Sequence, residues 1–392
     1  MRLAIIASHV IQYQDPFFRL LAADPDVDLT VFYLSSAGAE TYRDKDMGTT
    51  LRWDVELLTG YRHVFLRNLV HDSNRGWTRH VNPGIVPALL RRHFDMVISM
   101  TGWGSISAML GFLTCRLAGI PFFLYGDSSF PPPEDTLARR IRARMLRTLF
   151  RNVTGFMVSG VLNAVYYRHY GGDPDHFFLL PWAVDNDRFT EAARFAPGER
   201  EKMRERLSIR PEQTVFVFSA KLVERKDPMT LLRAYERMRE RAVVLFVGDG
   251  ELREPLETYA QEHALRGVRF VGFINQSDLP KYYAMSDVFV LPSTYEPRGA
   301  VINEAMACGL PVIVTNRCGS IGDIVLDGEN AFIYPAGDAD ALAASMTRLV
   351  DDAALRERMA QRSCEIIATW TFARGVEGVR SAMRWLEERK RA

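Results

Sequence analysis

The chain has 392 residues, of which 47% are hydrophobic and 25% are charged. At about 150 residues per domain, this length indicates two or three domains, and we predict two. The composition is that of an ordinary globular protein and excludes fibrous and disordered classes. The net charge of +1 supplies no global field that would hold nucleic acid, so we expect no nucleic-acid partner.

The spacing of the cysteines and the hydropathy of the chain indicate its cellular compartment. The four cysteines, Cys115, Cys308, Cys318 and Cys364, lie far apart, which is typical of reduced thiols and not of a zinc site. The first apolar run, residues 3–7, is too short to span a bilayer, and nothing near it resembles a secretory signal. We therefore predict a cytoplasmic protein without a transmembrane helix.

Short apolar runs alternate with longer amphipathic stretches along the whole chain. This alternation predicts an α/β protein in which parallel strands, buried on both faces, are separated by helices. In the first half the predicted strands are 3–7, 29–33, 63–66, 96–100, 122–125 and 155–158, and the predicted helices are 17–23, 84–93, 106–117, 137–151 and 161–170. In the second half the predicted strands are 215–219, 243–247, 268–270, 288–291, 311–314 and 331–334.

The restart of this pattern after residue 189 indicates two doubly wound, Rossmann-like domains. We place their boundary at 1–183 and 184–370, with residues 181–185 as the hinge. Doubly wound sheets bind ligands at the carboxyl ends of their strands. We therefore expect the two sheets to face each other across a cleft that holds the active site and closes over its ligand.

The segment 293–313, STYEPRGAVINEAMACGLPVI, carries the strongest functional signal. A predicted strand ends at Leu291, a loop follows, and a helix is predicted between Gly299 and Gly309. Glu296 then lies on the loop and Glu304 inside the helix, so that the two carboxylates can reach different parts of one elongated ligand. Without the rest of the segment, an exposed loop and a solvated helix face would explain both acids.

The start of this predicted helix is a candidate anion site. The backbone N–H groups around Arg298, Gly299 and Ala300 have no partner within the helix, and they lie at its positively polarised end. Such an end suits a pyrophosphate group.

Two lysines follow the predicted strand that ends at Ser219. An ammonium group of Lys221 or Lys226 at 4 Å from a phosphate charge would contribute about 4 kcal/mol at an effective dielectric near 20, before desolvation is subtracted. We predict that both stabilise a leaving nucleoside diphosphate and that Ser219 lies beside it. The alternative is that both lysines are solvated surface residues.

A glycine-containing turn, VGDGELREPL, follows the predicted strand 243–247. Gly248 permits close approach of a backbone to a ligand, which makes it a candidate donor-binding residue. A plain turn from strand to helix explains the same residues equally well.

The segment from Glu296 to Ile313 resembles the E-x7-E signature of retaining glycosyltransferase family 4, which includes bacterial group 1 glycosyltransferases. This resemblance implies a GT-B fold in which Glu304 holds the ribose hydroxyls of a nucleotide and Glu296 faces the donor sugar. Lys226 matches a lysine of the family. The family most often has Phe at the position of Arg298 and usually Arg at that of Lys221.

Further matches extend the resemblance over nearly the whole chain. VGFINQSDLPKYYAMSDVFVLPS, from residue 271, continues the family pattern and implies that Phe273 and Ile274 lie against the nucleotide base. The segments SHVIQYQDPFFRLL, RWDVELLTGY, TGWGS and YGDSS are similar to a bacterial subset of the family. The family also implies that the C-terminal helix, 371–392, joins the first domain.

Three residues of the first half are candidates on the acceptor side. His9, Trp103 and Asp127 each follow the carboxyl end of a predicted strand. The alternatives are a structural histidine, an aspartate that caps its loop, and a tryptophan that packs against the wall of the cleft.

The Arg-rich predicted helix in 137–152 has two interpretations. Its six arginines oppose an apolar stripe of Leu137, Ile141, Met145 and Leu149. Such a helix can lie on anionic lipid as a peripheral membrane contact and meet a lipid-linked acceptor. We favour the alternative, in which the stripe packs in the core and the arginines are solvated.

The family resemblance implies transfer of a hexose from a nucleotide-diphosphate sugar, UDP- or GDP-linked, with retained anomeric configuration. The acceptor would be a glycan, a lipid-linked or a small molecule, in bacterial surface polysaccharide or glycoconjugate biosynthesis. We expect no cofactor and no divalent metal, since no Asp-x-Asp pair occurs at the donor site and Asp44 and Asp46 are predicted as loop. The alternatives are an epimerase or phosphorylase of the same fold, or a non-catalytic nucleotide-sugar-binding partner.

Overall fold

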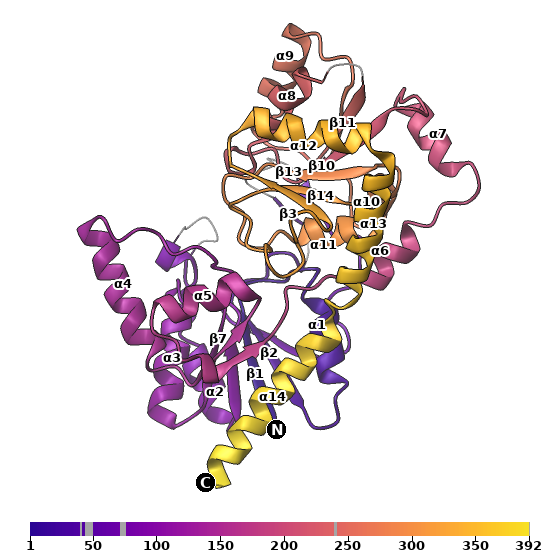
Figure 1. The fold of residues 1–392 in the computed structure, drawn as a ribbon. Helices are drawn as coiled ribbons and strands as arrows, with labels where there is room; N and C mark the ends of the chain where they lie inside the picture. Colours follow the sequence, from indigo (N-terminus) through magenta and orange to yellow (C-terminus); the bar gives the residue numbers. More distant parts are fainter. Residues whose placement is uncertain (40, 44–49, 71–75, 239–240, 392) are drawn as a thin grey trace. The chain divides into compact units, whose positions relative to one another are not determined.

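The structure, a computed structural model, describes residues 1–39, 41–43, 50–70, 76–238 and 241–391. The chain divides into two compact α/β units (Figure 1). Unit 1 consists of Met1–Tyr42, Glu56–Trp182 and Phe372–Ala392, and unit 2 of Arg43–Val55 and Ala183–Thr371. The grouping of residues 50–55 with unit 2 was not predicted. Asp44 and Asp46 lie outside the described residues.

Unit 1 contains a seven-stranded sheet in the order β5-β2-β1-β6-β7-β8-β9, whose paired neighbours run parallel. Its strands are β1 (Arg2–Ala7), β2 (Asp28–Tyr33), β5 (Arg62–Phe65), β6 (Met96–Ser99), β7 (Phe122–Tyr125), β8 (Gly155–Val158) and β9 (Phe177–Leu179). The strand order reverses between β1 and β6. Such a topological switch point is where doubly wound sheets bind ligands.

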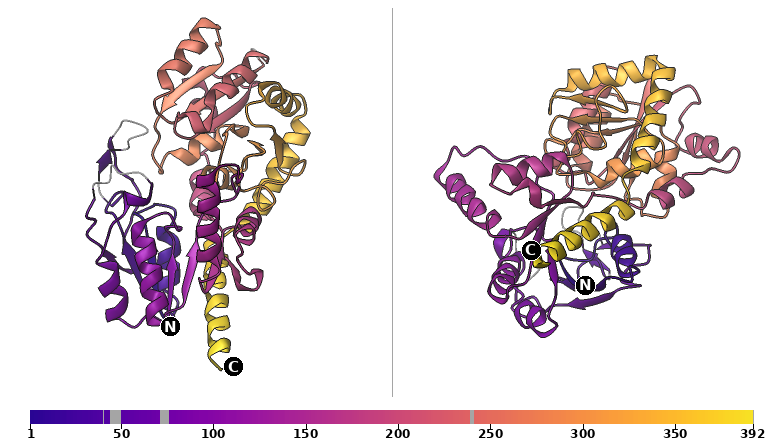
Figure 2. Two further views of the ribbon diagram at one scale, coloured as in Figure 1. Left: turned by 90° about the vertical axis from the view of Figure 1, so that its left-hand side faces the viewer. Right: turned by 60° about the horizontal axis from the view of Figure 1, so that its bottom comes forward.

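Helices cover both faces of this sheet because successive residues of a strand point to opposite sides. Leu3 and Ile5 of β1 pack under α1 (Asp15–Ala22) and α14 (Phe372–Arg391). Ala4 and Ile6 point to the other face, which is covered by α2 (Ile85–Arg91), α3 (Ile106–Ala118), α4 (Leu137–Phe150) and α5 (Val161–His169). Figures 1 and 2 show α14, in yellow, beside the strands of unit 1.

Unit 2 repeats this architecture with a six-stranded sheet in the order β12-β11-β10-β13-β14-β15, again with parallel neighbours. Its strands are β10 (Thr214–Ser219), β11 (Ala242–Val247), β12 (Val268–Gly272), β13 (Val288–Leu291), β14 (Val312–Thr315) and β15 (Ala331–Tyr334). Every residue of β10 and β11 is buried, as expected of strands covered on both faces. The switch point of this sheet lies between β10 and β13.

In the described part of unit 2, four helices connect the successive strands from β10 to β14 as in βαβ units, two precede β10 and two follow β15. They are α6 (Asn186–Ala192), α7 (Glu199–Arg206), α8 (Pro228–Glu236), α9 (Arg253–Glu262), α10 (Leu279–Ala284), α11 (Ala300–Ala307), α12 (Ala339–Asp351) and α13 (Ala353–Ala368). Two short strands, β3 (Tyr42–Arg43) and β4 (Thr50–Leu51), pair with each other.

The predicted α/β class and strand pattern are confirmed, with all predicted strand bounds correct to within two residues. The sequence missed β3, β4 and the three-residue β9, which are too short to give a clear apolar run. Within the described part of the chain, no helix combines the length and the hydropathy needed to cross a membrane.

Candidate functional site

Two loops of unit 2 meet at the switch point between β10 and β13. The loop after β10 ends in a 3-10 turn, η3 (Glu224–Lys226), and Asp227 then caps α8 by accepting hydrogen bonds from the amide and hydroxyl of Thr230. The ammonium group of Lys226 forms an ion pair with the carboxylate of Glu296 in the loop after β13. These side chains are only 12% and 7% exposed, so their charges are largely shielded from water.

Glu296 is held in place through both its side chain and its backbone. Its Oε2 atom also lies 3.7 Å from Nη1 of Arg225 and 3.5 Å from the hydroxyl oxygen of Ser293. Its backbone N–H donates to the carbonyl of Arg317 at 3.0 Å, and its carbonyl accepts from the N–H of Gly319 at 2.8 Å. The carboxylate therefore has a fixed position at the switch point before any ligand arrives.

The helix α11 begins at Ala300, four residues beyond Glu296. Gly299 occupies its N-cap position, and no side chain caps the first turn. Most of the rest of the helix is buried, from Ile302 to Ala307, which fixes its direction. The first-turn N–H groups near Ala300 thus provide a positively polarised end next to the Lys226–Glu296 pair.

Glu304 lies inside α11, and it is 5% exposed. The hydroxyl of Tyr283 donates to its Oε2 atom at 2.9 Å. Burial raises the pKa of the Glu304 carboxyl, although the Tyr283 hydroxyl, the charge of Arg188 and the Gln276 amide oppose this. Arg188 in turn donates to the side-chain oxygen of Gln276 at 2.7 Å and to its carbonyl at 2.9 Å.

The sequence did not predict Tyr283, Gln276 and Arg188 as part of this site. They come from α10, from the loop after β12 and from α6, three elements that only the tertiary fold brings to Glu304. A buried tyrosine on a short amphipathic helix gives no sequence signal that separates it from an ordinary core residue.

Ser219 and Lys221 begin the loop after β10. The Ser219 hydroxyl lies within hydrogen-bonding reach of Tyr283, whose pKa burial raises well above its ordinary value. Ser219 and Glu304 therefore share one partner, which places the end of β10 beside α11. Lys221, two residues further on, is half-buried.

The prediction for Arg298 concerned its backbone N–H, and the structure adds a buried ion pair of its side chain. Its guanidinium donates to the carbonyl of Gly319 at 2.7 Å and to the carboxylate of Asp323 at 2.9 Å, and both charged side chains are at most 3% exposed. This buried ion pair ties the loop after β14 to the start of α11. The Arg298 side chain thus has a structural role that the sequence did not indicate.

Gly248 is required by packing within unit 2. A Cβ atom at this position would lie 2.0 Å from the Ala220 carbonyl oxygen, and one at Gly250 would lie 2.5 Å from that of Leu222. The Gly248 amide also donates to the Gly272 carbonyl at 2.8 Å. The close approach that the sequence indicated is therefore an approach to the β10 loop, which favours the interpretation as a strand-to-helix turn.

We expect Gly248→Ala to lower the free energy of unfolding by about 2–4 kcal/mol, because the methyl group would collide with a backbone carbonyl. Gly337→Ala is the matched control, since Gly337 also has positive φ but a Cβ there would meet no atom within 4 Å. That control should lose only about 1 kcal/mol. Urea denaturation compares the two, and equal losses would show that close packing does not explain Gly248.

Phe273 and Ile274 follow β12 at the same sheet edge and are half-buried. The next residues contact the segment of unit 2 that comes from the first part of the sequence. The Asn275 side-chain amide donates to the Arg52 carbonyl at 2.8 Å, and the Ser277 amide donates to the Asp54 carboxylate at 3.2 Å. Residues 52–54 thus lie beside the predicted base-binding segment.

The acceptor-side candidates of unit 1 follow three adjacent strands. His9 follows β1, Trp103 follows β6 and Asp127 follows β7, and these strands are neighbours in the sheet. The Ser8 hydroxyl and Nδ1 of His9 are 2.9 Å apart, and the Arg142 guanidinium lies 4.8 Å from the centre of the Trp103 ring. All three candidates therefore lie at the carboxyl edge beside the switch point of unit 1.

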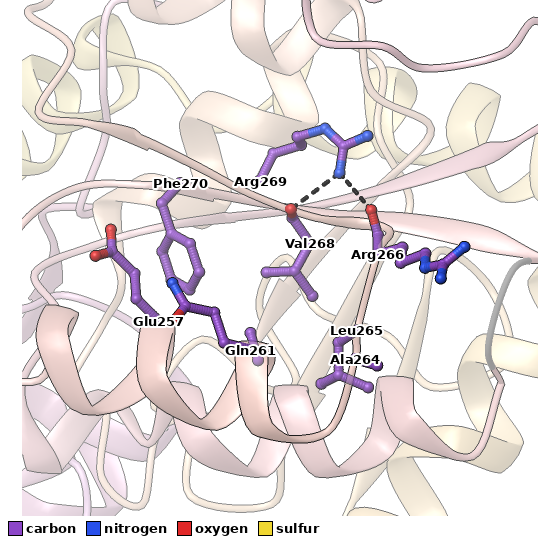
Figure 3. Close-up of a pocket in the computed structure, with 9 residues that line it drawn as sticks. Glu257, Gln261, Ala264, Leu265, Arg266, Val268, Arg269 and Phe270 are labelled. Atoms are coloured by element: carbon purple, nitrogen blue, oxygen red, sulfur yellow. Dashed lines mark hydrogen bonds between the residues drawn. The ribbon is translucent and has the colours of Figure 1, made fainter.

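A separate hollow of about 490 Å³ lies between α9 and the edge strand β12 (Figure 3). Its lining residues are Glu257, Ala260, Gln261, Ala264, Leu265, Arg266, Val268, Arg269 and Phe270. The Arg269 guanidinium is held by the carbonyls of Arg266 and Val268 at 2.6 and 3.0 Å. None of the predicted site residues lines this hollow, which begins at the amino end of β12.

Sequence comparisons concern mainly unit 2. Residues 199–365 match the family model described as glycosyl transferases group 1. The lipopolysaccharide core biosynthesis glycosyltransferase LpsE of Rhizobium meliloti is 36% identical over 180 residues, which cover 46% of this chain and 51% of LpsE. A GDP-mannose-dependent alpha-(1-6)-phosphatidylinositol monomannoside mannosyltransferase of Mycolicibacterium smegmatis is 34% identical over 184 residues, 44% of this chain and 47% of that enzyme. The chain thus matches about half the length of these curated relatives.

Structural comparison extends over both units. HepE of Anabaena in complex with UDP matches with a TM-score of 0.76, covering 98% of this chain and 100% of HepE at 16% sequence identity. The chain has the GT-B fold. At this identity the likeness establishes the fold alone. The family match lies within unit 2 of this GT-B chain, and it includes Lys226, Glu296 and Glu304.

Proposed function

We propose that the chain is a group 1 glycosyltransferase of retaining family 4 that transfers a hexose from a UDP- or GDP-sugar to an acceptor hydroxyl. The observation that carries this proposal is the Lys226–Glu296 ion pair, which lies at the switch point of unit 2 beside the uncapped start of α11. The match of residues 199–365 to group 1 glycosyl transferases supports it.

Each part of the donor has a counterpart in unit 2. The ionised Glu304 accepts hydrogen bonds from the ribose hydroxyls, and Tyr283 and Gln276 keep this carboxylate in position. The diphosphate binds the first-turn N–H groups near Gly299 and Ala300 and the ammonium groups of Lys226 and Lys221. The base lies against the backbone of Phe273 and Ile274.

The reaction requires stabilisation of a departing anion. The bond between the anomeric carbon and the diphosphate oxygen breaks, and the electron pair leaves with the diphosphate. The acceptor oxygen bonds to the same carbon from the same face, and its proton passes to a diphosphate oxygen. Lys226, already fixed by Glu296, neutralises the negative charge that develops, so that neither a divalent metal nor an enzyme nucleophile is required.

The acceptor binds to unit 1 in this proposal. His9 and Asp127 lie at the carboxyl edge of adjacent strands, where a hydroxyl-bearing ligand can bind. LpsE takes part in lipopolysaccharide core biosynthesis, which favours a bacterial surface glycoconjugate as the product.

A donor screen tests the proposal. Purified protein is mixed with UDP-, GDP-, ADP- and dTDP-sugars in EDTA, and thermal stabilisation and slow release of diphosphate are measured. We expect one nucleotide family to stabilise the wild type and to be hydrolysed slowly, and Glu304→Gln and Lys226→Ala to lose both effects. Lys202→Ala on the exposed face of α7 is the matched control and should behave as the wild type.

Three results would contradict the proposal. A shift that persists in both site variants would place the nucleotide elsewhere. Release of diphosphate that stops in EDTA would show that a metal is required. Conversion of the donor to its sugar epimer without an acceptor would replace the transferase with an epimerase.

A further inference from the structure

The exposed face of α4 carries large apolar side chains. Leu137, Ile141 and Met145 are 75%, 52% and 52% exposed, and their spacing of four residues places them along one side of the helix. The sequence favours a core position for this stripe. Of its four members only Leu149 is buried, so the structure corrects that interpretation.

The opposite side of α4 fixes the helix to unit 1. Ala143, Leu146 and Phe150 are buried in the core cluster that covers one face of the sheet. Arg142 lies over the Trp103 ring, and Arg147 pairs with Glu134. The helix is therefore held by its inner side, and the apolar stripe on its outer side is left uncovered in unit 1. Figure 1 shows α4 at the outer edge of that unit.

Arginines border the exposed stripe. Arg140 and Arg144 each follow an apolar stripe residue by three positions, which makes them neighbours on the helix surface. Both are exposed, and among the described residues no carboxylate forms an ion pair with either. Helix α4 contains no acidic residue, so its outer face combines apolar side chains with uncompensated positive charge.

We propose that this face of α4 docks on an anionic lipid surface, with Leu137, Ile141 and Met145 inserted below the headgroups and Arg140 and Arg144 at the level of the lipid phosphates. An apolar stripe bordered by arginines is the pattern of a helix that lies in a membrane interface. A nucleic acid would leave the apolar side chains without a partner. A second copy of α4 would bring like charges together.

The location of the docking face has a consequence for the acceptor. Arg142 connects α4 to the Trp103 loop, which ends at the same sheet edge as His9 and Asp127. A lipid-anchored acceptor bound at that edge would therefore stay close to the membrane that α4 contacts. This consequence rests on the proposed function, whereas the docking itself does not.

Vesicle sedimentation without donor or acceptor tests the docking, so its outcome is independent of transferase activity. The probes are vesicles of phosphatidylcholine alone and of phosphatidylcholine with phosphatidylglycerol. We expect the full chain to sediment with the anionic vesicles and to be released as salt rises. Ile141→Ser with Met145→Ser should weaken partitioning about tenfold, and Arg140→Gln with Arg144→Gln about 10- to 30-fold.

Matched controls separate the face from general surface effects. Leu117→Ser, at an 89% exposed leucine of α3, and Arg206→Gln with Arg358→Gln, at exposed arginines of unit 2, should bind vesicles as the wild type does. Circular dichroism confirms that all variants are folded. The proposal is overturned if the wild type stays in the supernatant with anionic vesicles, or if the α4 variants bind these vesicles as the wild type does. It is also overturned if sedimentation velocity shows that the wild type is a dimer and that Ile141→Ser with Met145→Ser makes it a monomer.

Discussion

Replacement of Lys226 by alanine should lower the rate of sugar transfer about 10²- to 10³-fold, the loss typical of removing one group that stabilises a developing anion. The ammonium group of Lys226 pairs with Glu296 at the switch point of unit 2, beside the uncapped end of α11. Without it, the departing diphosphate would meet an uncompensated carboxylate. Steady-state release of diphosphate, with the donor found in the screen, gives the change in kcat and KM.

The same substitution should also lower stability, because among the described residues Glu296 would keep only the more distant Arg225 as an ion-pair partner. An unpaired buried charge costs about 1–3 kcal/mol or more. The double variant Lys226→Ala, Glu296→Gln removes that charge and should recover much of the stability but not the rate. Recovery of the rate together with the stability would show that Lys226 acts only as a structural partner of Glu296.

Glu304→Gln is expected to weaken donor binding about 10- to 100-fold, because a ribose hydroxyl that donates to a carboxylate gains about 1.5–3 kcal/mol. Glutamine keeps the shape of the side chain, and its carbonyl oxygen can still accept from Tyr283. Calorimetric titration with the donor measures the change. Glu357→Gln, at an exposed position of α13, is the matched control.

The pKa of Glu304 predicts opposite effects on folding and binding. Burial raises the pKa of this carboxyl in the folded state above its value in the unfolded state. The protonated carboxyl therefore contributes to the stability of the fold at pH values below the unfolded pKa. This contribution is lost as the pH rises through the folded pKa. Glu304→Gln stays neutral and should therefore make the ligand-free protein at least as stable as the wild type at pH 7. Donor binding requires the ionised form, so wild-type affinity should fall as pH is lowered through the raised pKa.

The pH dependence of donor affinity and the stability of Glu304→Gln together show whether Glu304 binds the donor or only supports the fold. A nucleotide-diphosphate sugar has no phosphate group that titrates in this range, so a pH dependence that disappears in Glu304→Gln belongs to Glu304. If that variant instead unfolds more easily at pH 7 and binds the donor normally, Glu304 serves only the packing of α11.

The sequence predicted the sheets well because their strands are buried on both faces. Strands such as β10 and β11 consist of continuous apolar residues, a local pattern that needs no knowledge of the tertiary structure. The edge strand β9 has three half-buried residues and lacks this pattern. The segment 50–55 could not be assigned to unit 2, because its contacts are with residues more than 200 positions away.

The candidate site was predictable only where local sequence determines geometry. Glu296, Gly299 and Glu304 lie on one loop and one helix, so their spacing indicated their relation. The Lys226–Glu296 contact joins two loops that follow neighbouring strands, and it agrees with the order of a doubly wound sheet. The burial of the Arg298 side chain depends on Asp323, and that of Glu304 on Tyr283, so these environments appear only in the folded chain.

The position of residues 50–55 in the sequence constrains how the proposed donor site can be exchanged between relatives. Arg52 and Asp54 are encoded in the first part of the gene, but their hydrogen-bonding partners Asn275 and Ser277 lie in the second. Recombination that exchanged residues 183–371 between relatives would move the proposed donor-binding residues as a block and separate these partners. Under the proposed function, we expect a chimaera with a new nucleotide preference to need two matched pieces from one parent, a long piece from unit 2 and a short one from residues 50–55.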